Sequence, residues 1–227
     1  MGVKSAYLFL YNTALCAAWA YVLVLTTRHS KTKGSNQERW DSIDTVWQAV
    51  EVPLKVAQTA AVMEVVHSAV GLVRSPVLIT ATQVASRLFV LWGVVDLVPE
   101  AHRRPLVLAQ WGQTYLELSL LSLLVAWCCS EIIRYSFFAF KELGMQPYVL
   151  LWLRYTAFIV LYPLGVSSEL AEMPNKFNFA FDYYWACWLV VLLYLPGFPQ
   201  LYFYMLAQRR KVLRVGRISS SAKLKAQ

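Results

Sequence analysis

Residues 153–170 read LRYTAFIVLYPLGVSSEL, the most informative stretch of the chain. It is apolar and long enough to enter a lipid bilayer, which a helix crosses with about 20 residues. Within it lie Arg154, Tyr162 and Glu169. Ionisable groups at membrane depth are costly and usually mark a functional site. The sequence therefore predicts a membrane-spanning helix that carries chemistry.

Tyr162 and Glu169 are seven residues apart. A regular helix would place them on one face, about 10 Å apart along its axis. Pro163 and Gly165 lie between them and allow the backbone to depart from a regular helix, which would shorten that distance. An acid and a phenol facing one intramembrane cavity suggest proton-transfer chemistry on a lipid-like substrate. Spacing alone leaves an alternative open, namely an interfacial tyrosine and a glutamate in a loop beyond the membrane.

The composition indicates a membrane protein. The chain has 227 residues, of which 58% are hydrophobic and 15% charged, and its mean hydropathy is +0.46. That is too apolar for a soluble domain of this size. The formal net charge of +8 includes seven Lys/Arg after residue 208, where there is no acid. Basic and aromatic residues do not interleave as in a nucleic-acid site, so we expect no nucleic-acid partner.

Six apolar stretches are long enough to be membrane spans. They are Tyr7–Thr27, Val52–Val73, Val77–Val98, Tyr115–Tyr135, Tyr148–Ser168 and Tyr183–Leu206. The polar residues 28–51 and 99–112 are expected to form loops. We find neither an internal repeat nor a second domain. The prediction is an all-α, polytopic membrane bundle of about six helices, formed by a single domain over residues 1–227.

The tail predicts the orientation of the bundle. An even number of spans places both termini on one side of the membrane. The basic tail, residues 207–227, follows the last span directly, as is typical of a cytosolic segment. Lys223 and Lys225 near the end of this tail resemble a dilysine retention signal. We therefore expect a multi-pass protein of the endoplasmic reticulum membrane with both termini cytosolic.

Two arginines in or beside the predicted spans need partners. Arg87 and Arg134 are each expected to form a structural ion pair or to contact substrate. The candidate counter-ions are Glu64, Asp96 and Glu131. Glu131 and Arg134 are one helical turn apart and should partly neutralise each other. The four cysteines form neither a CxxC motif nor a cluster with histidine, so we expect neither a disulfide scaffold nor a metal site.

Five segments resemble, in order, one family of membrane enzymes. The most specific is R-Y-x-x-F-x-x-L-Y-P-x-G-x-x-x-E at residues 154–169. The others are VPLKVAQTAAVMEVVH at 52–67, QVASRLFVLWG at 83–93, EIIRYSFFAFKELG at 131–144 and PNKFNFAFDYYW at 174–185. On these segments the chain resembles the very-long-chain (3R)-3-hydroxyacyl-CoA dehydratases, also called protein-tyrosine-phosphatase-like A proteins, whose plant members are the Pasticcino 2 proteins.

The resemblance implies a lyase that dehydrates long- and very-long-chain (3R)-3-hydroxyacyl-CoA to trans-2-enoyl-CoA, the third step of microsomal fatty-acid elongation. Tyr162 and Glu169 match the catalytic pair of the family. One group must take the C2 proton while another protonates the departing C3 hydroxyl. Glu169 as base and Tyr162 as acid fit these roles, and the reverse assignment stays open. No metal or redox cofactor is implied.

Two further residues match the family motif. Arg154 would form a structural ion pair, anchor the catalytic pair or meet a phosphate of coenzyme A. Gly165 would permit close packing or a local bend. The implied partners, besides membrane lipid and the acyl-CoA substrate, are the elongase condensing enzyme, ketoacyl-CoA reductase and enoyl-CoA reductase.

Two features of the sequence bear on alternative functions. Residues 67–74, HSAVGLVR, mimic the phosphatase pattern H-C-x-x-G-x-x-R, but Ser68 replaces the nucleophilic cysteine and we expect the segment to lie inside an apolar helix. After Glu169 only three residues precede the segment Met173–Asn175, fewer than in the family. The alternative function is therefore a catalytically impaired isoform that acts as a membrane scaffold for elongase or signalling partners. A transporter is disfavoured because paired broken helices are not apparent.

Overall fold

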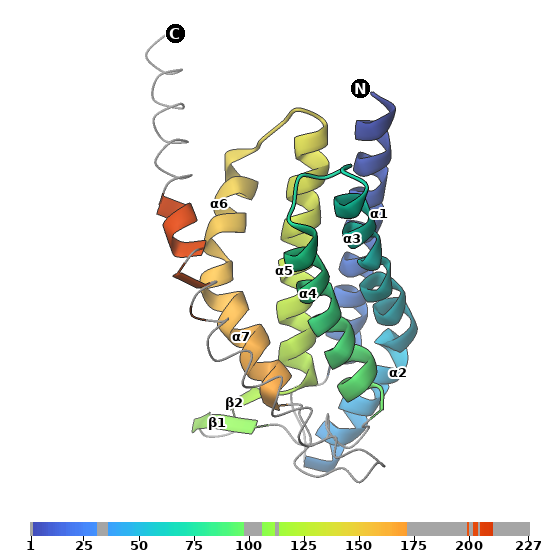
Figure 1. Ribbon diagram of the computed structural model, residues 1–227. Helices are drawn as coiled ribbons and strands as arrows, with labels where there is room; N and C mark the ends of the chain where they lie inside the picture. Colours follow the sequence, from blue (N-terminus) through green and yellow to red (C-terminus); the bar gives the residue numbers. More distant parts are fainter. Residues whose placement is uncertain are drawn as a thin grey trace.

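The computed structural model describes residues 2–30, 36–97, 106–111, 114–171, 199, 202–203 and 205–210. Its main elements are helices that run alternately up and down in one bundle (Figure 1). They are α1 (Val3–His29), α2 (Asn36–Ala60), α3 (Val62–Ala69), α4 (Val77–Leu88), the π-helical η1 (Phe89–Val95), α5 (Leu120–Glu142), α6 (Tyr148–Thr156) and α7 (Phe158–Ala171). The prediction of an all-α membrane bundle is confirmed.

Three helices of the described chain are long and apolar enough to cross a membrane: α1, α4 continued by η1, and α5. The pair α6 and α7 makes a fourth if its 42° bend lies within one span. These correspond to the first, third, fourth and fifth predicted spans. The sixth predicted span, Tyr183–Leu206, lies mainly outside the described residues.

Helix α5 is the centre of the bundle, because it packs against α1 on one side and α7 on the other (Figure 1). Trp19 and Val22 of α1 are fully buried and belong to the same core as Leu123 and Trp127 of α5. Close packing of this kind drives helix association in lipid, where hydrophobic burial offers little.

The prediction of a loop over residues 28–51 is wrong for its second part, because α2 begins at Asn36. From Ile43 onward, every third or fourth residue of this helix is apolar and at most 3% exposed: Ile43, Val46, Val50, Leu54 and Ala57. Mean hydropathy hides such a stripe, since the other faces of the helix are polar. Spacing rather than apolar length is the signal that finds α2.

The second predicted span, Val52–Val73, is not continuous. Helix α2 ends at Ala60 and α3 begins at Val62. The hydroxyl of Tyr11 on α1 donates to the Ala60 carbonyl at 3.0 Å, which satisfies a backbone group at the break.

The fourth span begins later than predicted. Residues Leu106–Trp111 (β1) and Thr114–Leu118 (β2) form an antiparallel hairpin outside the bundle. Ser119 then caps α5: its side chain and that of Ser122 complete a reciprocal capping box. Membrane-spanning structure therefore starts at Leu120 rather than at Tyr115.

Candidate active site

Helix α7 carries both residues of the predicted catalytic pair. Tyr162 is half-buried, and Glu169 lies near the end of the same helix, with its side chain outside what the structure describes. The helix is continuous through Pro163, so the expected departure from helical geometry between the pair is not found. The break lies earlier, at Ala157. Tyr162 and Glu169 therefore stand within about 20° of each other around the axis and about 10 Å apart along it.

Two serines connect α7 to the first turn of α5. The hydroxyls of Ser122 and Ser168 are 2.7 Å apart, and Ser168 is fully buried. Ser122 also donates to the carbonyl of Ser119 and accepts from its N–H. Because the single Ser122 proton goes to that carbonyl, Ser168 acts as the donor between the two hydroxyls. This bond fixes α7 at the residue next to Glu169.

Gly165 faces Ala126 of α5, but neither expected role for this glycine is found. An added Cβ would lie 3.9 Å from the Ala126 Cβ, an ordinary van der Waals contact. The backbone of α7 is also helical at this position. Neither close packing nor a bend therefore requires glycine here.

Arg134 on α5 is held by two carboxylates. It donates to Glu64 of α3 through both terminal nitrogens, at 2.6 and 2.7 Å. Its Nε donates to Glu131, one turn earlier, at 2.9 Å. Tyr135 donates a further hydrogen bond to Glu64. The expected Glu131–Arg134 pair is confirmed as part of a larger network.

Arg87 extends this network to α4, because its guanidinium pairs with Glu131. Two arginines and two glutamates thus form one neutral cluster across three helices. The remaining candidate counter-ion, Asp96, pairs instead with Lys55 of α2 at 2.5 Å. Since guanidinium N–H groups occupy Glu64 and Glu131, these carboxylates are poorly suited to act as bases. Arg87 and Arg134 are therefore both engaged in ion pairs with glutamates in this arrangement.

Arg154 has a different environment. Its guanidinium carbon lies 4.5 and 4.6 Å from the ring centres of Phe137 and Phe138 on α5. Its Nη1 is buried without a hydrogen-bond partner. No ion pair joins it to a carboxylate among the residues that the structure describes. The expected structural ion pair of Arg154 is therefore not found there.

The segment that mimics a phosphatase loop is not inside a helix as predicted. Helix α3 ends at Ala69, and Gly71 adopts a positive φ of 72°. Three backbone N–H groups of this turn are used within it: residues 70, 71 and 73 donate to the carbonyls of residues 66, 68 and 67. Ser68 itself donates to the Ser75 carbonyl at 2.6 Å. The turn has Ser68 where the phosphatase pattern needs a cysteine, so it offers no thiolate.

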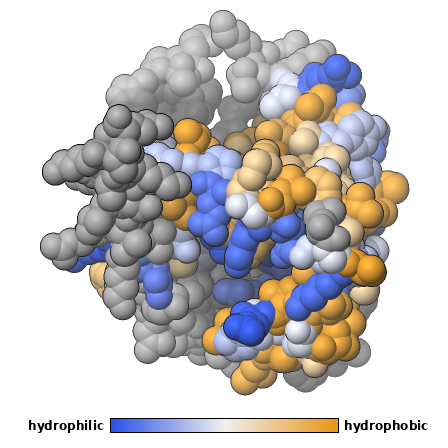
Figure 2. Space-filling model, turned by 90° about the horizontal axis from the view of Figure 1, so that it is seen from above, coloured by the Kyte–Doolittle hydropathy of each residue, from blue (hydrophilic) through white to orange (hydrophobic). Residues whose placement is uncertain are grey.

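Among the described residues, no group of three or more His, Cys, Asp or Glu side chains is arranged to hold a metal ion. Hydrophilic residues gather toward the middle of the bundle end at which α1 begins, and on its described part hydrophobic residues lie beside them (Figure 2). Apolar helices around an internal charge cluster and a tyrosine–glutamate helix define an integral-membrane protein with an intramembrane candidate active site.

The chain belongs to the family described as Protein tyrosine phosphatase-like protein, PTPLA, whose model matches residues 58–215. It is 42% identical to the very-long-chain (3R)-3-hydroxyacyl-CoA dehydratase PASTICCINO 2 of Arabidopsis thaliana, over 93% of this chain and 94% of the relative. It is 40% identical to the very-long-chain (3R)-3-hydroxyacyl-CoA dehydratase 2 of Homo sapiens, over 93% and 82%. No solved structure matches it.

Replacing Glu131 by alanine tests the charge cluster. The substitution leaves Arg87 and Arg134 short of a counter-ion, and breaking a buried pair in this way costs roughly 3 kcal/mol. We expect a clearly lower unfolding temperature in detergent micelles, whereas Lys141→Ala on the exposed face of α5 should leave it unchanged. Equal unfolding temperatures for the parent and Glu131→Ala would contradict a stabilising role.

Replacing Gly165 by alanine tests whether this glycine serves the fold. The contact at 3.9 Å leaves room for the new methyl group, and alanine favours a helix over glycine by about 1 kcal/mol. The unfolding temperature should therefore stay the same or rise slightly. A marked fall would show that packing against Ala126 is tighter than the geometry indicates.

Proposed function

We propose that this protein dehydrates long- and very-long-chain (3R)-3-hydroxyacyl-CoA to trans-2-enoyl-CoA. The observation that carries the proposal is the identity of 40–42% with dehydratases over nearly the whole chain, together with Tyr162 and Glu169 on one continuous helix. An acyl chain suits a site between apolar helices, while the coenzyme A head group stays in water. The reaction itself requires only an acid and a base.

Tyr162 and Glu169 are proposed as those two groups. Glu169 takes the proton from C2, and Tyr162 gives its proton to the C3 hydroxyl, which leaves as water. Glu64 and Glu131 are held by arginines, so the proposal relies on the one carboxylate of the motif. The bond between Ser122 and Ser168 supports it, because it fixes the backbone beside Glu169.

The setting of the reaction is proposed from the same features. The apolar spans indicate an integral-membrane protein. The basic tail and its dilysine pattern favour the endoplasmic reticulum with both termini in the cytosol. Elongation of an acyl chain also needs condensation and two reductions, so the condensing enzyme, ketoacyl-CoA reductase and enoyl-CoA reductase are the proposed partners. No redox group is needed for the dehydration step itself.

The test is formation of enoyl-CoA by the full chain in membranes. Tyr162→Phe and Glu169→Gln each remove one proton-transfer group and should lower turnover roughly 100- to 10,000-fold. Tyr148→Phe and Glu142→Gln make the same chemical changes outside α7 and should leave turnover unchanged. Normal turnover by Glu169→Gln would refute the assignment of the pair. A stably inserted but inactive parent would refute the enzyme and favour the scaffold function.

A further inference from the structure

Arg154 lies in an aromatic setting between α5 and α6. The faces of Phe137 and Phe138 lie 4.5 and 4.6 Å from its guanidinium carbon, and the ring of Tyr155 lies at 5.9 Å. Such rings hold a cation in position through cation–π attraction. The phenylalanine rings cannot accept the in-plane N–H bonds of a guanidinium, which carries five donors. Among these three side chains, only the Tyr155 hydroxyl offers Arg154 a hydrogen-bond acceptor.

The environment of Arg154 differs from those of Arg87 and Arg134. Arg87 and Arg134 both pair with glutamates. Arg154 has a buried Nη1 without a hydrogen-bond partner, and no carboxylate of the described residues pairs with it. Arg154 as a whole is half-buried, and a charge partly withdrawn from water without an anionic partner is costly. An anion supplied by a ligand would compensate for this cost.

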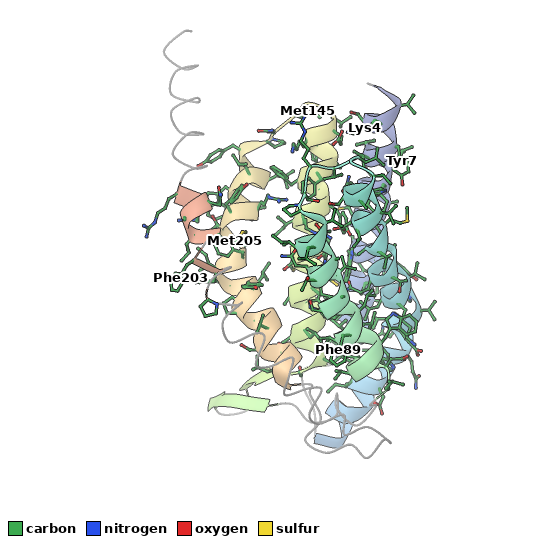
Figure 3. The ribbon with its side chains drawn as sticks, viewed as in Figure 1. Lys4, Tyr7, Phe89, Met145, Phe203 and Met205 are labelled. Carbon is green, nitrogen blue, oxygen red and sulfur yellow. The ribbon has the colours of Figure 1, made fainter. Side chains whose placement is uncertain are left out.

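The position of Arg154 along α6 indicates which part of a bound ligand it would contact. Helix α6 starts beside Met145, at the bundle end that also carries Lys4 and Tyr7 (Figure 3). Hydrophilic residues gather in the middle of this end (Figure 2). Arg154 lies about 9 Å along the helix from its start, and Tyr162 lies roughly 12 Å further on. A ligand that enters from this end passes Arg154 before it reaches the catalytic pair.

A second cation approaches the same helix. Arg209, in the C-terminal segment, donates from Nε to the Thr156 hydroxyl at 3.4 Å. The same segment contacts the start of α7, since the rings of Tyr202 and Phe158 meet edge to face, with their centres 5.7 Å apart. Phe203 and Met205 mark where it runs beside the junction of α6 and α7 (Figure 3). Two arginines, Arg154 and Arg209, therefore lie near the end of α6.

We propose that the Arg154 guanidinium binds a phosphate group of the coenzyme A moiety of the substrate. The planar fork of arginine matches phosphate oxygens in a bidentate geometry. In an acyl-CoA the pantetheine arm separates the phosphates from the thioester, as α6 separates Arg154 from the catalytic pair. The inference rests on the proposed dehydratase function, because that function supplies the ligand.

The first experiment measures binding without turnover. Free coenzyme A is titrated by calorimetry into the detergent-solubilised full chain, its Arg154→Gln variant and Lys141→Gln, a matched loss of charge on the exposed end of α5. Loss of a charge-assisted hydrogen bond worth about 1.5–3 kcal/mol predicts a Kd raised roughly 10- to 100-fold in Arg154→Gln. Lys141→Gln should bind like the parent. An unchanged Kd in Arg154→Gln overturns the proposal.

The second experiment compares two substrates that share the acyl group. Arg154→Gln should raise KM for the (3R)-3-hydroxyacyl-CoA by about the same 10- to 100-fold factor, with kcat retained. KM for the corresponding acyl-pantetheine, which lacks the nucleotide phosphates, should not change. An equal loss with both substrates indicates a structural role and overturns the proposal. Binding of phosphatidic acid vesicles that depends on Arg154, with coenzyme A binding intact, makes a lipid phosphate the ligand and also overturns it.

Two outcomes separate this inference from the proposed function. A parent that binds coenzyme A through Arg154 but forms no enoyl-CoA supports the binding site and refutes the dehydratase. If the Arg154→Gln variant dehydrates the substrate as well as the parent does, the dehydratase function is supported and the Arg154 binding site is refuted. If Arg154→Gln does not fold, Arg154→Lys keeps the charge over the rings but loses the fork. Its Kd for coenzyme A should rise about fivefold, near 1 kcal/mol, and no rise overturns the proposal.

Discussion

Charge neutrality inside an apolar bundle is the constraint on which the rest of the structure depends. An unpaired charge at this depth costs several kcal/mol, so each cation needs an anion within reach. Glu64, Glu131, Arg87 and Arg134 meet that demand together and have no net charge. Because they come from α3, α4 and α5, satisfying the charges also fixes these helices relative to one another. Helix α5, held in this way, then positions α7 through Ser122.

The sequence predicts helices well where apolar length is the physical signal. Helices α1, α5 and the α4–η1 unit were expected from long apolar stretches and are present. Prediction fails where a helix has one buried stripe and polar faces, as in α2, because averaging over a window removes the periodic signal. It also fails at Leu106–Leu118, where a hairpin of mixed polarity precedes α5.

The residues of the candidate site could be named from the motif, but their partners could not. The partner of Arg134 on α3 is Glu64, which lies 70 residues away in the sequence, and only the packing of α3 on α5 brings them together. Three carboxylates were equally plausible for Arg87 on residue type alone. The rings around Arg154 were not anticipated. Ion pairs can be predicted by looking for a residue of opposite charge, whereas the aromatic partners of a cation–π contact carry no charge. Ser168 carried a weaker signal, as a polar residue inside an apolar helix.

The two short helices α6 and α7 follow each other directly and are bent at Ala157. If Arg154 on α6 binds the coenzyme A phosphate and the catalytic pair lies on α7, the backbone of these two helices sets the distance between the two sites. The distance from Arg154 to the catalytic pair is then the same for every substrate, whatever its acyl chain. Selection among acyl chains has to occur past Glu169, where α7 approaches the β1–β2 hairpin and the base of α5. Specificity for chain length can therefore change there without disturbing the head-group end.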